Sequence, residues 1–487
     1  MTLSALDSNG QAQPALRSGW TIQQVQALFL ALVFFCLPFN GINGPQVLRE
    51  LSVEASIYPL FCFLLATLSL VATRLLSDLR VLLLLLAVPM MLLLNYMLAY
   101  DDISVAMLGE ISGSAKFVNS TLVFLLYVYF AFAVFAFLRT VTLAQIAQFV
   151  RRVVHPLVVF LVIIWIIEVV SWYIDPLREL ITPIKRFVST GPYFAKGRLS
   201  GVSFEPSFNS IVMVGLLPAL WFGALYRGNS IGERQRYALF GLLFIIFGTM
   251  SDSRTAYLIM LAQLLLLVGL YLFGTRVARM VSLAVILPLA IIVAPPVFLY
   301  TLGGDLSGIA GSTNRISDIT RLTAVNAAID MWTRHPYGGV GFGQYGFYYR
   351  SAVNYVSTLS WEVNAFLGEA RADEFPPSYS LYWRILAETG IVGFTAFYGV
   401  MWSFFVGLAR AMGIRRLTRD ETNLILATAI GLAGALLIGV SFDSYRTPFI
   451  WIYAGMAAAV PTIIRREVRR RKLEAETASA SDAKASA

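Results

Sequence analysis

Long apolar runs alternate with short polar connections along most of the chain. Each run extends over about 20 residues, the length that an α-helix needs to cross the ~30 Å hydrocarbon core of a bilayer. The pattern predicts twelve membrane-spanning helices, near residues 22–40, 56–73, 81–99, 121–138, 153–173, 207–226, 237–251, 255–274, 280–299, 380–408, 422–440 and 448–464. The predicted fold class is therefore an all-α polytopic membrane protein with both chain ends on the same side.

Basic residues gather in every second connection between these spans, and this alternation predicts the orientation. The clusters are Arg74 and Arg80; Arg139, Arg151 and Arg152; Arg227, Arg234 and Arg236; Arg276 and Arg279; Arg410, Arg415, Arg416 and Arg419; and the stretch from Arg465 to Lys472. Connections rich in Lys and Arg stay in the cytoplasm. These clusters and both termini are therefore predicted to lie inside, and the other connections outside.

The spans divide the chain into five predicted parts. They are a cytoplasmic segment (1–20), nine spans (21–299), a large periplasmic loop (300–379), three spans (380–464) and a basic, then disordered, cytoplasmic tail (465–487). Within the large loop, apolar residues recur every three or four positions, at Ile316, Ile319, Leu322, Val325, Ile329 and Trp332. This spacing predicts an amphipathic helix that lies on the membrane or caps a cavity. The alternative is a helix that only packs against the bundle.

Composition supports the membrane assignment and removes several function classes. The chain is 58% hydrophobic and only 13% charged, which excludes an ordinary soluble domain. The net charge of +9 comes mostly from the cytoplasmic clusters, which face anionic membrane lipid, so no nucleic-acid partner is expected. With two histidines and no metal-binding spacing, the sequence predicts neither a metal site nor a cofactor. The Gly341–Gly346 segment matches GxGxxG but is predicted to be a tight outward loop, because no strand and helix flank it.

Arginines predicted on the outward side are not explained by the rule that basic connections stay in the cytoplasm. They are therefore candidates for substrate binding or catalysis. Arg198 stands just before the sixth span, and Arg254 stands in the very short turn before the eighth. Arg384, early in the tenth span, and Arg446, in the turn before the last span, are weaker candidates. A guanidinium group binds phosphate oxygens through paired hydrogen bonds. The alternative is that each arginine reaches lipid headgroups or pairs with a carboxylate such as Asp252.

Glu205 is the only carboxylate in the 197–207 segment, which also contains Arg198. It follows Arg198 by seven residues and stands where the chain enters the membrane, directly before Pro206. A carboxylate at an apolar boundary is suited to act as a base near neutral pH. The alternative is structural, because a carboxylate before a proline in the first helical turn is favoured by the helix dipole.

Four motifs occur in a fixed order over residues 190–400. They are GRLSGVSFEPS at 197–207, SDSRTA at 251–256, RHPYGGVGFG at 334–343 and ILAETGIVG at 385–393, and a long outward loop precedes the last one. Through these motifs the chain resembles the O-antigen ligase/polymerase superfamily, the Wzy-like membrane glycosyltransferases that act on undecaprenyl-diphosphate-linked glycans. The first five spans resemble the family only in general character.

The resemblance implies a metal-independent glycosyltransferase of the GT-C type, in which Arg198 and Arg254 hold the diphosphate of the lipid donor. Ligases of the family usually carry a catalytic His-Asn pair shortly before the Ala-Glu-Thr-Gly segment. In this chain, Tyr379 and Ser380 stand at that position. The Glu-Pro-Ser segment at 205–207 also resembles the polymerase branch. Glu205 is therefore the expected catalytic base, with His335 and Tyr379 as competing candidates.

The expected function is polymerisation of lipid-linked oligosaccharide repeat units at the periplasmic face of a bacterial inner membrane. The expected partners are the undecaprenyl-diphosphate-linked glycan and membrane lipid, and a chain-length regulator protein is a further candidate. One alternative is a ligase that transfers the glycan to lipid A-core. The non-enzyme alternative is a transporter, which predicts ionisable residues deep in the spans, whereas Glu168, the clearest one, lies toward the outer half of its span.

Overall fold

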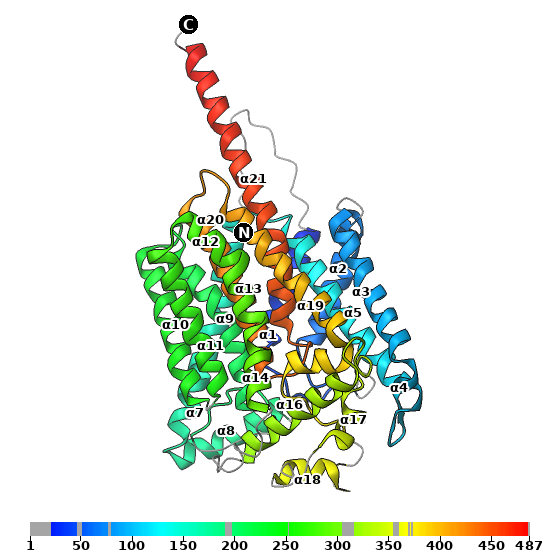
Figure 1. Ribbon diagram of the computed structural model, residues 1–487. Coiled ribbons are helices and arrows are strands. Elements are labelled where there is room, and N and C mark those ends of the chain that lie inside the picture. Colours follow the sequence, from blue (N-terminus) through cyan, green and yellow to red (C-terminus); the bar gives the residue numbers. More distant parts are fainter. Residues whose placement is uncertain are drawn as a thin grey trace.

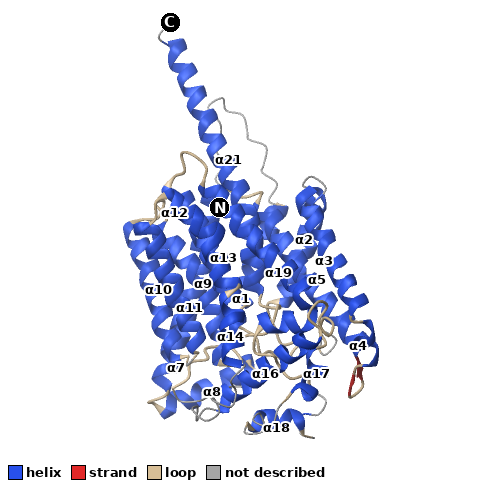
Figure 2. Ribbon diagram, viewed as in Figure 1, coloured by secondary structure: helices blue, strands red, loops and turns tan. Residues whose placement is uncertain are grey.

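The structure is a bundle of long helices, with short helices covering one end (Figures 1 and 2). The computed structural model describes residues 21–45, 51–75, 79–189, 197–251, 253–303, 316–353, 360–368, 371 and 374–485. The predicted cytoplasmic segment 1–20 lies outside these residues. In the described part, the only strands are β1 (Met107–Leu108) and β2 (Ile111–Ser112), which have two residues each and pair as an antiparallel hairpin. Eight of the described helices are long and apolar enough to cross a membrane. The chain is therefore an all-α polytopic membrane protein.

Each of the twelve predicted spans coincides with a helical stretch. These stretches are α1 (Ile22–Cys36); α2 (Ile57–Leu75); α3 (Leu79–Leu98); α5 (Gly113–Leu138); α6, η2 and α7 (Leu143–Phe149, Val150–Val154 and His155–Ser171); α9 (Pro206–Leu225); α10 (Ile231–Met250); α11 and η3 (Arg254–Val268 and Gly269–Phe273); α12, η4, α13 and α14 (Arg276–Val281, Ser282–Ile286, Leu287–Ile292 and Ala294–Gly303); α19 (Leu381–Met412); α20 and η7 (Arg419–Leu437 and Ile438–Val440); and α21 (Pro448–Ala485).

Several helices extend beyond the predicted apolar segments, because capping residues and helix formers continue them. Ser112 caps α5, which begins eight residues before the predicted edge at 121. A capping box at Ser230 and Glu233 begins α10 before the predicted edge at 237. At the other end of the chain, the prediction of a disordered tail is wrong, since α21 continues to Ala485. The tail is rich in Ala, the residue with the highest helix propensity.

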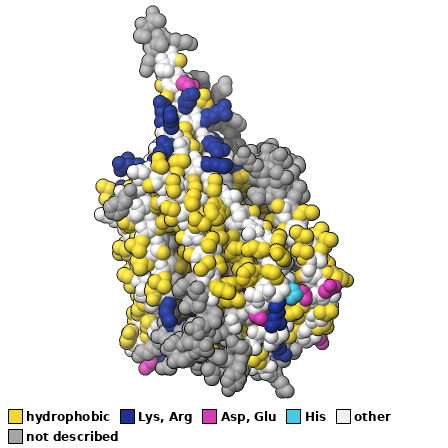
Figure 3. Space-filling view, viewed as in Figure 1, with side chains coloured by type: hydrophobic (Ala, Val, Ile, Leu, Met, Phe, Trp, Pro, Cys, Tyr) yellow, Lys and Arg dark blue, Asp and Glu magenta, His cyan; other side chains and the backbone are white. Residues whose placement is uncertain are grey.

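The basic connections lie together at one end of the bundle and contact one another there. Arg466 of α21 donates to the carbonyl oxygen of Arg139, after α5. Arg471 binds the Glu421 carboxylate of α20 at 2.8 Å. On the face shown in Figure 3, Lys and Arg gather around α21 above a broad hydrophobic band, and most Asp and Glu lie toward the opposite end. We call the basic end the inward end and the opposite end the outward end.

At the outward end, a buried ion pair holds the GRLSG motif in place. The pair joins Glu168 of α7 to Lys185 of α8 (Asp175–Val188), a helix that the sequence pattern did not predict, with 2.6 Å between Oε1 and Nζ. The same carboxylate accepts hydrogen bonds from the backbone N–H groups of Ser200 and Gly201, at 3.2 and 2.7 Å. Burial lowers the pKa of Lys185, and the Glu168 charge opposes that shift. Glu168 therefore fixes the backbone that follows Arg198.

A break in α19 forms the second fixed point of the outward end. Gly390 has φ 61° and ψ −167° inside the helix, so the carbonyl groups before it lose their helical partners. The loop that follows α16 (Ile316–Arg334) supplies replacements, because Val340 N–H donates to Ala387 O at 2.8 Å and Gly341 N–H donates to Glu388 O at 3.0 Å. The tight glycine loop that was predicted here is confirmed, with positive φ at Gly339, Gly341 and Gly343.

Asn95 of α3 joins the loop and the broken helix. Its side-chain amide donates to Gly338 O at 2.7 Å and to Glu388 O at 3.1 Å, and its oxygen accepts from Phe342 N–H at 2.8 Å. Asn95 is buried and cannot rely on water for hydrogen bonds. The three contacts use both N–H groups of its amide and one lone pair of its oxygen. Three segments that are far apart in the sequence therefore meet at one side chain.

The outward end is completed by α16 and by two short helices, α17 (Tyr345–Ala352) and α18 (Trp361–Leu367). Helix α16 packs against α14 and α19, and Trp332 meets Trp383 edge to face with ring centroids 5.9 Å apart. Ile319, Val325 and Ile329 of the predicted apolar face are buried. Helix α16 is thus packed on the bundle, as the alternative interpretation of its periodicity expected.

We expect Gly390→Ala to destabilise the protein, because a Cβ there would lie 2.1 Å from the carbonyl oxygen of Tyr337 and φ is positive. Backbone strain of this kind costs about 1–3 kcal/mol. The matched control is Gly399→Ala on the same helix, where a Cβ meets nothing within 4 Å. Thermal unfolding in detergent should show a lower midpoint for the first variant only. Equal midpoints would contradict the proposed constraint.

We expect Glu168→Gln to destabilise the protein by about 3–5 kcal/mol, because it leaves the buried Lys185 ammonium without its ionic partner. The double variant Glu168→Gln/Lys185→Met removes both charges and should recover much of that loss. Unfolding midpoints in detergent give the comparison. If the two substitutions lower the midpoint additively, the pair does not act as a unit.

Candidate active site

Two of the predicted diphosphate ligands stand on segments that the structure brings together. Arg198 lies in the GRLSG motif before α9, and Arg254 is the first residue of α11. The motif joins the end of α10 through a hydrogen bond from Leu199 N–H to Met250 O, at 2.9 Å. The hydroxyl groups of Ser210 and Ser251 lie 2.8 Å apart and link α9 to the turn before Arg254. We call these two segments, 197–210 and 251–255, the first arginine cluster.

Glu205 is the N-cap residue of α9, followed by Pro206 in the first turn. Its side chain makes no capping hydrogen bond to the helix backbone, and its carboxylate accepts from the Ser207 hydroxyl at 2.7 Å. The residue is half-buried. The helix end therefore does not use the side chain as a backbone cap, which leaves the carboxylate close to Arg198 in sequence and at the membrane boundary.

Arg384 belongs to a second group of charges around the loop between α20 and α21. Its Nε donates to Glu388 Oε1 at 3.1 Å, and its Nη1 donates to the backbone oxygen of Asp443 at 3.3 Å and lies 3.7 Å from the Asp443 carboxylate. Asp443 also accepts from Ser378 N–H at 2.7 Å. Two carboxylates thus face Arg384, which favours the alternative that the sequence left open, a structural ion pair.

Arg446 lies in the same loop, three residues after Asp443. Its backbone N–H and Nε both bind the Ser444 hydroxyl, at 3.1 and 3.3 Å. Arg446 also lies close enough to the Tyr127 hydroxyl of α5 to act on it electrostatically, and Tyr127 donates to the Glu54 carboxylate at 2.9 Å. We call Arg384, Asp443 and Arg446, with their contacts, the second arginine cluster.

The two clusters meet at the start of α9. Phe208, three residues after Glu205, packs edge to face against Phe442 of the loop between α20 and α21, with ring centroids 5.0 Å apart. The first outward loop closes the other side, because Asn40 accepts from Phe204 N–H at 2.8 Å and Pro38 O accepts from the Ser203 hydroxyl at 2.9 Å. The segment that carries Glu205 therefore packs against the loop that carries the second arginine cluster.

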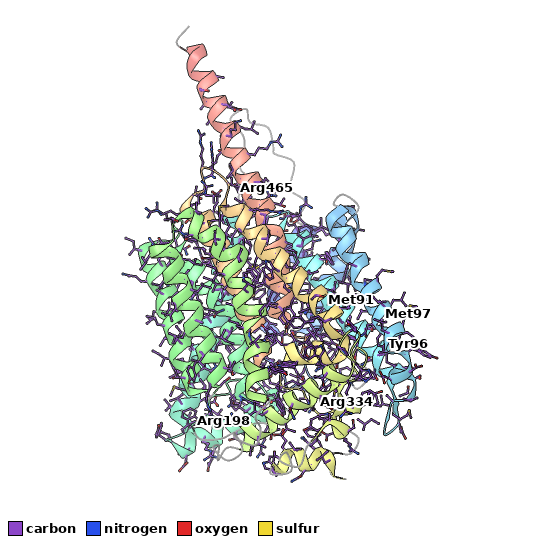
Figure 4. The ribbon with its side chains drawn as sticks, in the orientation of Figure 1. Met91, Tyr96, Met97, Arg198, Arg334 and Arg465 are labelled. Atoms are coloured by element: carbon purple, nitrogen blue, oxygen red, sulfur yellow. The ribbon has the colours of Figure 1, made fainter. Side chains whose placement is uncertain are left out.

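His335 lies on another side of the outward end. Its Nδ1 is 3.3 Å from the Asp102 carboxylate of α4 (Tyr100–Val105), next to α3. Figure 4 shows the same separation, since Arg198 lies at the α7–α9 side and Arg334, the neighbour of His335, lies toward α3 and α4. The structure therefore pairs His335 with a carboxylate, an arrangement that orients an imidazole.

Tyr379 has positive φ, at 53°, and donates its hydroxyl to Glu362 of α18 at 2.6 Å. Burial and the Glu362 carboxylate raise the pKa of this hydroxyl, while Arg321 above the ring lowers it in part. A raised pKa keeps the phenol protonated near neutral pH, so the geometry disfavours Tyr379 as a base and suits it as a hydrogen-bond donor.

Sequence analysis did not identify four residues that organise this end: Lys185, Asn95, Asp443 and Asp102 as the partner of His335. Asn95 and Glu168 are polar residues inside apolar runs, which is a signal of a specific role in a membrane. Asp443 and Lys185 carried no such signal, because both stand in polar connections. Among the described residues, no group of three or more His, Cys, Asp or Glu comes together as a metal-ligand set.

Comparison with known proteins connects this arrangement to a family. Residues 237–398 match the O-antigen ligase family. The matched region extends from α10 to the middle of α19 and contains Arg254, His335, Tyr379 and Arg384, whereas Arg198, Glu205 and Arg446 lie outside it. No curated protein matches the chain. The chain is thus a polytopic membrane protein whose residues 237–398 match the O-antigen ligase family, which is consistent with the O-antigen ligase/polymerase superfamily.

Proposed function

We propose that this protein polymerises undecaprenyl-diphosphate-linked oligosaccharide repeat units, as in O-antigen or a related surface polysaccharide. The observation that carries the proposal is the first arginine cluster. Two motifs that are separate in sequence, each with one arginine, meet at the outward end beside Glu205. An all-helical site with paired arginines and a carboxylate at the membrane boundary fits a lipid-linked diphosphate donor.

The proposed reaction needs an acceptor and a donor held in position, and groups that stabilise the charge of the leaving diphosphate. A sugar hydroxyl of the acceptor attacks the anomeric carbon of the donor sugar, and the new glycosidic bond forms as the bond to the diphosphate breaks. The leaving undecaprenyl diphosphate takes the electron pair, and arginines that are already in place stabilise its developing charge. A base removes the hydroxyl proton during attack. In this proposal Arg198 and Arg254 bind the diphosphate, Glu205 is the base and no metal takes part.

The second arginine cluster has a different proposed role. Arg384 already faces Glu388 and Asp443, so a diphosphate would have to displace a carboxylate to bind it. We therefore assign Arg384 to holding the loop between α20 and α21 against α19. Arg446 stays a proposed ligand of the donor, because it stands on the loop that packs against the first cluster through Phe442 and Phe208.

The alternative is a ligase that transfers the glycan to lipid A-core. The ligase resemblance places a His-Asn pair where this chain has Tyr379 and Ser380, and Tyr379 is held by Glu362 as a hydrogen-bond donor. This difference favours the polymerase. Product analysis separates the two, because a polymerase yields polymer on undecaprenyl diphosphate and a ligase yields capped lipid A-core.

The proposed location is the bacterial inner membrane, with the outward end in the periplasm. The collection of Lys and Arg at the inward end supports this orientation. The partners are the lipid-linked glycan and the surrounding lipid. A chain-length regulator protein remains a proposed partner, to be sought by co-purification.

We expect Arg198→Ala and Arg254→Ala each to lower polymer formation about 100-fold or more, because each removes a charge-stabilising donor from the leaving group. Lys at either position should recover part of the activity, since it keeps the charge but loses the paired hydrogen bonds. The measurement is a gel ladder formed by purified protein from lipid-linked repeat units. Arg186→Ala, an exposed arginine of α8 outside both clusters, is the matched control and should form a normal ladder. A normal ladder from either cluster variant would remove that arginine from the site.

We expect Glu205→Gln to abolish turnover while retaining the lipid-linked donor, because the amide keeps the shape of the carboxylate but cannot accept the proton. The competing variant is His335→Ala, which breaks the contact with Asp102 and should leave the ladder intact. Donor retention is measured by co-purification of labelled lipid. If Glu205→Gln polymerises normally and His335→Ala does not, His335 is the base.

A further inference from the structure

A large cavity lies between helices of the bundle, and none of the arginines of the two clusters lines it. It has a volume of about 680 Å³, within the range of roughly 300–1,000 Å³ that is typical of ligand sites. Its walls come from α1, α5, α6 with η2, α9, α20 and α21. The cavity is open at one end and its walls are mostly apolar, so its shape and lining suit a ligand with a long apolar part.

The polar residues of the cavity gather at one end. The walls are almost entirely apolar from Leu30 to Phe34 on α1, from Val134 to Leu138 on α5 and from Pro218 to Phe222 on α9. The exceptions are Thr21, Gln23, Gln24, Gln145, Gln148 and Arg152, which stand at the first turns of α1 and around the start of α6. Of the described residues that line the cavity, Arg152 alone carries a charge.

Burial shows which end is open. Phe449 and Tyr453, at the outward end of the cavity, are buried, and the Tyr453 hydroxyl donates to Gly215 O at 2.7 Å. At the inward end, Gln24, Leu28 and Gln148 are exposed. A ligand therefore enters from the inward side, with its apolar part toward Phe449 and its polar part near Arg152.

The wall beside the opening has an unusual backbone. Residues Val150–Val154 form a single π-helical turn between α6 and α7, and Val150, Arg152, Val153 and Val154 all line the cavity. Such turns occur often at functional sites. Gln148, with its amide oriented to satisfy both groups, accepts from the Arg152 guanidinium at 2.9 Å. Arg152 of this turn and Gln148 of α6 thus place a guanidinium group and an amide at the opening of the cavity.

We propose that this cavity is a binding site for an anionic glycerophospholipid of the inward leaflet. One acyl chain fills the space between α1, α5, α9 and α21, and the phosphate group binds Arg152. The occupant must combine a long apolar chain with a negative head, because the walls are apolar and the single charge at the mouth is positive. Anionic lipid is attracted to the basic face of a membrane protein, and this cavity opens at the basic end.

The test uses purified full-length protein in phosphatidylcholine vesicles that contain a trace of phosphatidylglycerol with a photoreactive acyl chain. After illumination, mass spectrometry maps the labelled peptides. We expect label on α1, η2 and the Pro218–Phe222 segment of α9. Ala27→Phe places a ring in the cavity and should remove that label, whereas Ala31→Phe, one turn further along α1 and outside the cavity, should not.

The headgroup is tested by a second matched pair. Arg152→Gln should lower labelling of the cavity peptides roughly tenfold, as expected for loss of a charge-assisted hydrogen bond. Arg151→Gln removes the neighbouring charge, which faces Asn229 and Glu233 and does not line the cavity, and should leave the labelling unchanged.

Three outcomes would overturn the proposal. The first is label that Ala27→Phe does not reduce, with Ala219→Phe, a second filling variant on α9, giving the same result. The second is equal labelling by a photoreactive phosphatidylcholine together with no effect of Arg152→Gln. The third is loss of label when excess undecaprenyl phosphate is added, because the occupant would then be the carrier lipid.

Discussion

The outward end of this protein depends on how a broken membrane helix satisfies its backbone. In a bilayer, carbonyl groups without partners are costly, and irregular backbone persists only where other protein groups bind it. At Gly390 of α19, the backbone N–H groups of Val340 and Gly341 bind the carbonyls of Ala387 and Glu388, and the Asn95 amide bridges both segments. The glycines of this loop are required because the loop backbone lies against the helix backbone. A Cβ on Gly339 would lie 2.4 Å from the Glu388 carbonyl carbon.

The outward arginines stand in two different parts of the structure. Arg384 faces Glu388 and Asp443, so its charge is largely balanced within the protein. Such a pair holds elements in register, and removing one partner costs more than the pair contributes. Arg198 and Arg254 stand on two loops that meet through backbone and serine contacts. Glu168 and Lys185 hold the backbone at Ser200 and Gly201, the two residues that follow Leu199 in the motif that carries Arg198.

The sequence was sufficient for the helices but not for the partners of single side chains. Apolar length and the Arg alternation located each of the twelve helical stretches, since both signals are local and repeated. Helix edges were less predictable because Ser112 and Ser230 cap helices outside the apolar runs. In the Leu473–Ala485 tail, a composition rich in Ala, Ser and Glu predicted disorder, whereas the structure is helical there and Ala favours helix. Pairings such as His335 with Asp102 join residues more than 200 positions apart, and no periodic pattern encodes them.

The Asn95 contacts also impose an order on biosynthesis. Asn95 enters the membrane with α3, but its partners Gly338 and Glu388 follow 243 and 293 residues later. Until α19 has been made and has broken at Gly390, the Asn95 amide lacks the carbonyl and N–H groups that it binds in the finished bundle. The loop after α16 likewise has no backbone partners until Ala387 and Glu388 arrive. The contacts of the outward end are consequently completed last, and a chain released from the ribosome before α19 lacks the Ala387 and Glu388 carbonyl groups that this end requires.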